Sequence, residues 1–73
     1  MIVYDKFWET LKRKGMSTYT LREYHDVHTD TIKKLRENKS MNTETLSRLC
    51  EILECELSDI TEYKYDDRDQ NKD

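Results

Sequence analysis

The chain has 73 residues, of which 34% are hydrophobic and 40% charged, with a single glycine and no proline. This length predicts one domain with a thin hydrophobic core, and the shortage of glycine and proline favours helices over many tight turns. No hydrophobic run approaches the length of a membrane span, and the opening MIVYDKFW is not a basic leader followed by an apolar stretch. We therefore expect a cytoplasmic protein.

The net charge of −3 is unevenly distributed along the chain. Residues 12–39 hold eight of the 13 lysines and arginines but only four of the 16 acidic residues. The rest of the chain is strongly acidic. A basic segment of this kind can contact a polyanion even where the whole chain is acidic, so the net charge does not exclude a nucleic-acid partner.

The first helix is predicted over about residues 5–14. Asp5 is a favourable N-cap residue, and hydrophobic side chains around Trp8 recur at helical spacing. Basic residues fill the last turn, where they complement the helix dipole. Gly15 stands where a left-handed C-terminal cap is expected, so the helix should end there.

A second helix is predicted to run from Ser17 or Thr18, either of which can cap it, to about Tyr24. Leu21 and Tyr24 lie three residues apart and can share one face of this helix. Residues 25–27 are predicted to form the turn that follows it.

A third helix is predicted over about residues 29–37, with Asn38 as a left-handed cap. Val27, Ile32 and Leu35 point to one side, and the opposite side is polar and carries cations. A helix of this form suits reading of the DNA major groove. An ordinary solvated helix of a small bundle has the same pattern, so periodicity alone leaves both interpretations open.

The fourth predicted helix carries the clearest hydrophobic stripe of the chain, and Asn42 or Thr43 can cap it. Its hydrophobic positions are Leu46, Leu49, Cys50 and Leu53. Their spacing of i, i+3, i+4 and i+7 predicts that this helix packs on the core, where Leu46, Leu49 and Leu53 should be buried together with Trp8.

The last part of the chain is predicted to hold a short helix and a possible strand. Leu57 and Ile60 indicate a short fifth helix. Polar and aromatic residues then alternate over 61–65, which could pair with residues 2–4 in a two-stranded β-ribbon or remain coil. Residues 66–73 contain no apolar group to bury, so we expect a disordered acidic tail.

The spacing of cysteines and histidines does not indicate a metal site. Cys50 and Cys55 lie five residues apart, which does not favour a disulfide, and His25 and His28 complete no zinc-finger set. We expect buried free thiols and structural histidines. The sequence also lacks a glycine-rich phosphate loop and a Ser/His/Asp constellation, so we expect no enzyme, no cofactor, no metal and no small-molecule substrate.

The segments GMSTYTL (15–21), HTDTIKKLRENKSM (28–41) and ETLSRLCEILECELSDI (44–60) resemble helix-turn-helix repressors of the Cro/CI-type, or XRE, family. The resemblance covers about residues 5–62, and the opening MIVYDKFWETL is similar to that of very small stand-alone bacterial members. It implies an all-α, five-helix, lambda-repressor-like DNA-binding domain over residues 1–65, with the β-ribbon as a possible addition.

Three residues depart from the pattern of this family. Arg22 stands where many members have a small residue, which implies looser packing between the second and third helices or a solvent-facing side chain. Asp26 stands where glycine is common and would have to adopt a left-handed turn, which Asp tolerates better than most residues. His28 replaces the usual Ser or Thr cap, so the angle of the third helix is the feature most open to change.

The resemblance implies a sequence-specific double-stranded DNA-binding transcriptional regulator, expected to be a repressor that occupies an operator and reads the major groove with helix 29–37. The implied base-reading residues are Thr29, Asp30, Lys33 and Lys34. The implied phosphate-binding residues are Ser17, Thr18, Lys39 and Ser40. Asp30 could instead pair with Lys34 on the helix surface, and Ser17 and Thr18 could serve only as caps.

A protein-interaction module is the alternative function, in which an antitoxin-like or anti-repressor protein carries a vestigial helix-turn-helix. The acidic part of the chain from Glu44 onward supports this alternative. For the DNA-binding function, selectivity favours a homodimer on an inverted repeat. The surface expected for it comprises Leu57, Ile60, Tyr63, Tyr65, Ile2 and Val3. These residues could also merely cover the core of the monomer.

Overall fold

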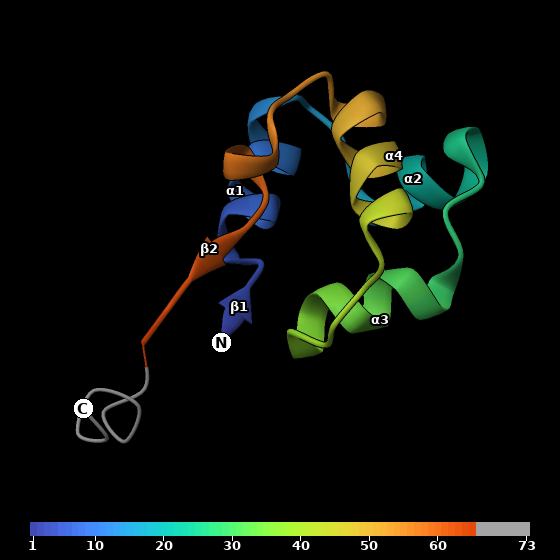
Figure 1. The fold of residues 1–73 in the computed structure, drawn as a ribbon. Coiled ribbons are helices and arrows are strands. Elements are labelled where there is room, and N and C mark those ends of the chain that lie inside the picture. The colour runs from blue at the N-terminus through green and yellow to red at the C-terminus, as the bar shows by residue number, and fades with distance from the viewer. Residues whose placement is uncertain (66–73) are drawn as a thin grey trace.

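The computed structural model describes residues 1–65, which form four α-helices, one 3₁₀ turn and a two-stranded β-ribbon (Figure 1). The elements in chain order are β1 (Ile2–Val3), α1 (Asp5–Arg13), α2 (Thr18–His25), α3 (Thr29–Glu37), α4 (Thr43–Leu53), η1 (Leu57–Asp59) and β2 (Glu62–Tyr63). In Figure 1, α4 lies between α1 and the ribbon on one side and α2 and α3 on the other. The tail predicted for residues 66–73 lies outside the described residues.

The helix ends agree closely with the predicted ones because residues with left-handed backbone follow the helices. Gly15, Asp26 and Asn38 have φ of 71°, 59° and 55°. Gly15 and Asn38 are the predicted caps. Asp26 adopts the left-handed conformation expected for a residue that stands where the family often has glycine.

Each of the four α-helices contributes at least one fully buried side chain to a single core. The largest fully buried side chains are those of Phe7, Leu21, Leu35, Leu49 and Leu53 in the helices, and that of Ile60 after η1. Leu49 and Leu53 are buried as predicted, whereas Trp8 and Leu46 are only partly buried against this core. The i, i+3, i+4, i+7 stripe of α4 thus identifies the packing face correctly, with Leu46 at its edge.

The predicted fifth helix is wrong, because residues 57–59 form a single 3₁₀ turn. The Glu56 N–H donates to Asp59 Oδ2 at 2.9 Å, which closes the turn over three residues. The chain then becomes extended at Glu62, where it pairs with β1. A helix cannot continue there because the backbone groups of this segment are committed to the ribbon.

Of the two predicted conformations for residues 61–65, ribbon and coil, the structure has the ribbon. β1 and β2 are antiparallel, with Ile2 opposite Tyr63 and Val3 opposite Glu62. The Lys64 N–H extends the pairing with a 2.9 Å bond to the carbonyl oxygen of Met1. Thr10 also links α1 to η1, since its hydroxyl donates to the Asp59 carbonyl at 2.6 Å.

Two residues expected on a dimer surface are instead part of the monomer's core. Val3 is 7% exposed and Ile60 is fully buried. Ile60 directly follows η1, which packs against α1 and α4, so its side chain closes the core from this side.

Tyr24 does not share the buried face with Leu21, because its side chain is 74% exposed and its ring packs edge-on against Tyr19. The Val27 N–H donates to the Leu21 carbonyl at 2.9 Å, which brings Val27 back beside α2. Val27 is buried in the core that holds Leu21, and Tyr24 remains in solvent.

The left-handed residue that ends α4 offers a test of backbone strain. Glu54 has φ of 52°, a conformation that costs a residue with a Cβ about 1–2 kcal/mol and glycine much less. We expect Glu54→Gly to stabilise the domain by about 1 kcal/mol, which should raise the melting temperature by about 4–8 °C in a calorimetric scan.

The matched control for this prediction is Glu51→Gly, since Glu51 is an exposed glutamate on α4 itself. There the same substitution should destabilise by about 0.5–1 kcal/mol, because glycine is a poor helix former. A lower melting temperature for Glu54→Gly would contradict the left-handed assignment.

Candidate nucleic-acid interface

The second helix begins with a reciprocal cap that identifies Ser17, and not Thr18, as its N-cap. Ser17 Oγ accepts from the Thr20 N–H at 3.3 Å, and the Ser17 N–H donates to Thr20 Oγ1 at 3.4 Å. Thr18 is therefore the first helical residue. Both candidate phosphate ligands stand where the free N–H groups of α2 begin.

The N-cap of the third helix is His28, in place of the more usual Ser or Thr. Its Nδ1 accepts from the Asp30 N–H at 3.1 Å. The same nitrogen lies 3.7 Å from Asp30 Oδ2. Because a nitrogen that accepts from an amide cannot also hold a proton for a carboxylate, we assign the cap as the interaction. The cap fixes the start of α3 directly after the turn.

The four predicted base-reading residues are all exposed on α3, whose Ile32 and Leu35 are buried. They are Thr29, Asp30, Lys33 and Lys34. Among the described residues, the ion pairs within 4 Å do not include one between Asp30 and Lys34. The Lys34 ammonium is therefore not held by the surface pair that was the alternative for these two residues.

The other two predicted phosphate ligands, Lys39 and Ser40, are exposed and follow the C-terminal end of α3. The Lys39 N–H donates to the Lys34 carbonyl at 2.9 Å, so Lys39 follows the helix without a flexible spacer. The predicted contacts thus divide into two groups. Thr18 lies close to Thr29 and Lys33, and the Lys39–Ser40 pair lies beyond the C-terminus of α3.

Tyr4 holds the loop after α3 in place. Its N–H donates to Asn38 Oδ1 at 2.9 Å, and its hydroxyl donates to the Lys39 carbonyl at 2.7 Å. Tyr4 is also the N-cap residue of α1, so the predicted Asp5 cap is wrong; Asp5 is the first helical residue. The Tyr4 side chain is only 2% exposed, and burial raises the pKa of its phenol. The bond that fixes this end of α1 joins residues 34 positions apart in sequence, so a local sequence pattern could not indicate it.

A groove of about 350 Å³ between α2 and α3 contains two cations that the sequence analysis did not assign to the site. Its lining residues are Thr18, Arg22, Thr29, Ile32, Lys33, Arg36 and Glu37. Arg22 is solvent-facing, one of the two options that its departure from the family pattern left open. Arg36 lies three residues after Lys33, so helical spacing could have placed it beside the predicted readers.

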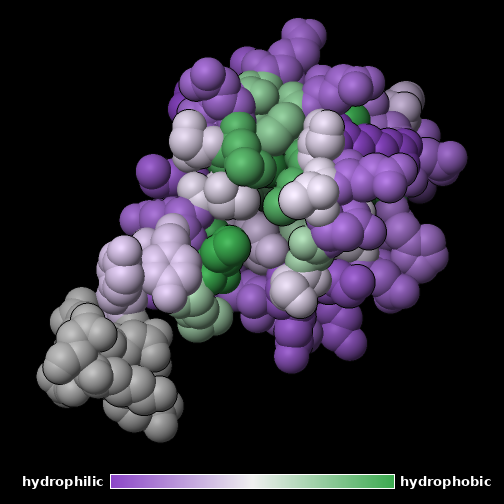
Figure 2. All heavy atoms as spheres, in the orientation of Figure 1, coloured by the Kyte–Doolittle hydropathy of each residue, from purple (hydrophilic) through white to green (hydrophobic). Residues whose placement is uncertain are grey.

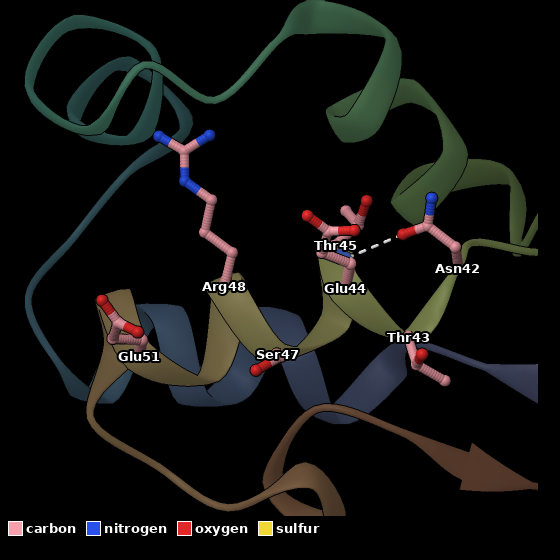
Figure 3. A pocket seen from close by; sticks show the side chains of 7 residues that line it. All are labelled: Asn42, Thr43, Glu44, Thr45, Ser47, Arg48 and Glu51. Carbon is pink, nitrogen blue, oxygen red and sulfur yellow. Dashed lines mark hydrogen bonds between the residues drawn. The ribbon is translucent and has the colours of Figure 1, made fainter.

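A wider recess lies elsewhere, along α4 (Figure 3). Asn42 Oδ1 caps this helix by accepting from the Thr45 N–H at 2.8 Å. Arg48 extends from α4 toward the end of α2, where its Nη2 donates to the His25 carbonyl. The Arg48 guanidinium is engaged in this hydrogen bond, and the recess is open and polar. We therefore assign Arg48 a structural role.

The two cysteines carry free thiols, as predicted, but both are half-buried and not fully buried. Burial, with a smaller contribution from neighbouring Cys50, raises the pKa of the Cys55 thiol. No group of three or more His, Cys, Asp or Glu side chains in residues 1–65 could hold a metal ion. None of the helices described is long and apolar enough to span a membrane.

Together these features define a helix-turn-helix module. Two short helices are joined by a left-handed turn, and the second presents hydroxyl and amino groups on its outer face. The family model of the Cro/C1-type HTH DNA-binding domain matches residues 6–66. The chain therefore belongs to the Cro/C1-type helix-turn-helix DNA-binding domain family.

The solved structure of one protein is similar over nearly the whole chain. It is the crystal structure of the transcriptional regulator VanUg in its Form II, with 32% sequence identity and a TM-score of 0.79. The match covers 89% of this chain and 87% of the VanUg chain. No curated protein matches the sequence.

Proposed function

We propose that the protein is a sequence-specific transcriptional regulator that binds double-stranded DNA and represses by occupying its operator. The observation that carries the proposal is the exposed face of α3, where Lys33 and Lys34 are free of ion pairs within the described residues. Membership of a DNA-binding family and the similarity to a transcriptional regulator support it. In this function α3 enters the major groove.

The base-reading roles follow from the chemistry of each side chain. Lys33 and Lys34 can donate to O6 or N7 of guanine, and Asp30 can accept from N4 of cytosine. Thr29 offers a hydroxyl group and a methyl group that suits thymine. A protein with these readers should discriminate each contacted base pair by about 1–3 kcal/mol.

The phosphate-binding roles belong to the two ends of the helix pair. At the start of α2, the Ser17 hydroxyl accepts a hydrogen bond from the Thr20 N–H, and it lies 3.3 Å from Thr20 Oγ1, where either hydroxyl can be the donor. When the Thr20 hydroxyl donates, the Ser17 proton is free to bind a phosphate oxygen. Thr18 adds a second hydroxyl beside the free N–H groups of the helix. Beyond α3, Lys39 and Ser40 supply a cation and a hydroxyl.

Selection of binding sites from a random DNA pool tests the proposal directly. We expect enrichment of one sequence, which then resists competition by random DNA in a gel shift. If no duplex binds even at low salt, the function fails. The interaction module with a vestigial helix-turn-helix would then be favoured, since its acidic part would bind a protein.

We also propose that the regulator acts as a homodimer on an inverted repeat, because one helix-turn-helix offers too few base contacts for operator selectivity. The exposed residues around the ribbon supply a surface for this. They are Ile2, Leu57, Tyr63 and Tyr65. In Figure 2 a band of hydrophobic residues lies in the middle of the view, beside the ribbon and between hydrophilic areas. Tyrosines that are exposed in the monomer are well suited to such an interface.

Tyr63→Ala should weaken this dimer, since it removes an exposed ring that packs on the ring of Tyr65, with ring centres 4.8 Å apart. We expect light scattering at micromolar concentration to show dimers of the wild type and a shift toward monomer for the variant. Cooperative occupation of the two half-sites should weaken in parallel.

Tyr24→Ala is the matched control. Tyr24 is also an exposed tyrosine, but it lies on α2, away from the ribbon. It should leave the mass unchanged. A wild type that stays monomeric and fills an inverted repeat one copy at a time would refute the dimer.

A further inference from the structure

The groove between α2 and α3 concentrates positive charge beyond what the predicted readers provide. Arg22 reaches it from α2, and Lys33 and Arg36 from α3. Glu37 is the one acidic residue in its lining. None of the three cations forms an ion pair within 4 Å among residues 1–65, so their charge is available to an external anion.

Arg36 is restrained by an aromatic partner. Its guanidinium carbon lies 5.5 Å from the centre of the Trp8 ring. Trp8 is in turn held edge-on against Phe7, with ring centres 5.0 Å apart, and Phe7 is fully buried. A guanidinium over an aromatic face can still donate its N–H groups, so this contact with Trp8 leaves Arg36 able to bind an oxyanion.

The lining of the groove suits a phosphate group better than an apolar small molecule. Ile32 is its one hydrophobic residue, and the others carry charges or hydroxyl groups. Pockets for small molecules are lined mainly by hydrophobic and aromatic side chains. The groove also includes Thr18, Thr29 and Lys33, which places it on the face proposed to meet DNA.

From this arrangement we infer that the groove between α2 and α3 seats a backbone phosphate of DNA, bound by Arg22 and Arg36 beside the base reader Lys33, with Trp8 holding Arg36 in position. The inference rests on the proposed function. It adds a phosphate contact beside the base-reading face, and that contact would fix how far α3 enters the major groove.

The alternative is that Arg36 only covers the ring of Trp8. Under that alternative Arg36→Ala alters stability but not the salt dependence of DNA binding. Arg22 stacks on no aromatic ring among the described residues, so Arg22→Ala tests the phosphate seat without disturbing Trp8.

The experiment measures affinity for the selected duplex, and for a random-sequence duplex, over a range of NaCl concentrations. Arg22→Ala and Arg36→Ala should each weaken binding to both duplexes by about tenfold and reduce the slope of log K against log salt by about 1. The control is Arg13→Ala, which removes an exposed arginine from the last turn of α1, outside the groove. It should change affinity less than twofold.

Trp8 supplies a second readout because it is the only tryptophan in the chain. Saturating DNA should change its fluorescence in the wild type, since a phosphate bound by Arg36 neutralises the cation over the ring. The Arg36→Ala variant should bind DNA more weakly, and its Trp8 fluorescence should not change even at saturating DNA. Circular dichroism verifies that this variant is folded.

Two outcomes separate the inference from the proposed function. If the wild type binds the selected duplex but both groove variants keep its affinity and salt slope, the phosphate seat is wrong and the DNA-binding function stands. If the wild type binds no duplex at low salt, the proposed function fails and the phosphate seat is overturned with it.

Discussion

An increase in NaCl from 50 to 200 mM should lower the affinity of the protein for its operator by roughly 10³–10⁵-fold. This range applies to proteins that neutralise about 6–10 phosphates, because each neutralised phosphate releases counterions. A dimer reaches this number if each protomer contacts three phosphates: one at the start of α2, one in the α2–α3 groove and one at Lys39. Fluorescence anisotropy of a labelled duplex measures the effect.

The two kinds of lysine should respond differently in this measurement. Lys39→Ala should weaken binding to all sequences alike and reduce the salt slope by about 1 for each protomer. Lys34→Ala should instead relax the preference at one base pair per half-site, by about 1–3 kcal/mol. Binding that does not depend on salt would show that the cationic face makes no backbone contacts.

Leu49→Ala should cost about 2–5 kcal/mol of folding free energy, the typical range for a buried leucine replaced by alanine. Leu49 is 1% exposed and lies on the buried stripe of α4, within the one core that all four helices share. Domains of this size have little stability in reserve, so the loss can unfold a substantial fraction of the protein. Urea denaturation followed by circular dichroism at 222 nm gives the free energy.

Leu57→Ala provides the comparison, because Leu57 is 52% exposed and lies in η1 at the edge of the fold. Its replacement should change stability by less than about 0.5 kcal/mol in the monomer. A near-neutral result for Leu49→Ala would mean that α4 does not pack as the structure shows.

The helices themselves could be predicted from the sequence because their signals are local. α3 spans Thr29–Glu37, as the hydrophobic spacing and Asn38 indicated. α4 begins at Thr43 with Asn42 as its cap, one of the two predicted options. Caps and i, i+3, i+4 contacts involve residues within one or two turns of each other, so the sequence contains the whole interaction.

Three candidate readers, Asp30, Lys33 and Lys34, could also be placed from the sequence, since residues on the side of α3 opposite Ile32 and Leu35 must be exposed once those two are buried. The groove residues Arg22 and Arg36 were missed. Arg22 belongs to a different helix, and only the packing of α2 on α3 brings it beside Lys33 and Arg36.

The sequence by itself therefore determined the four α-helices and which face of α3 is polar. Only the tertiary structure decided that Tyr4 starts α1 by bonding to Asn38 and that Ile60 belongs to the core. It also decided that residues 57–59 form one 3₁₀ turn before the chain pairs with β1. The Tyr4–Asn38 bond, the Thr10–Asp59 bond and the pairing of β1 with β2 join residues more than 30 positions apart, and such partners leave no periodic signal in a local stretch of sequence.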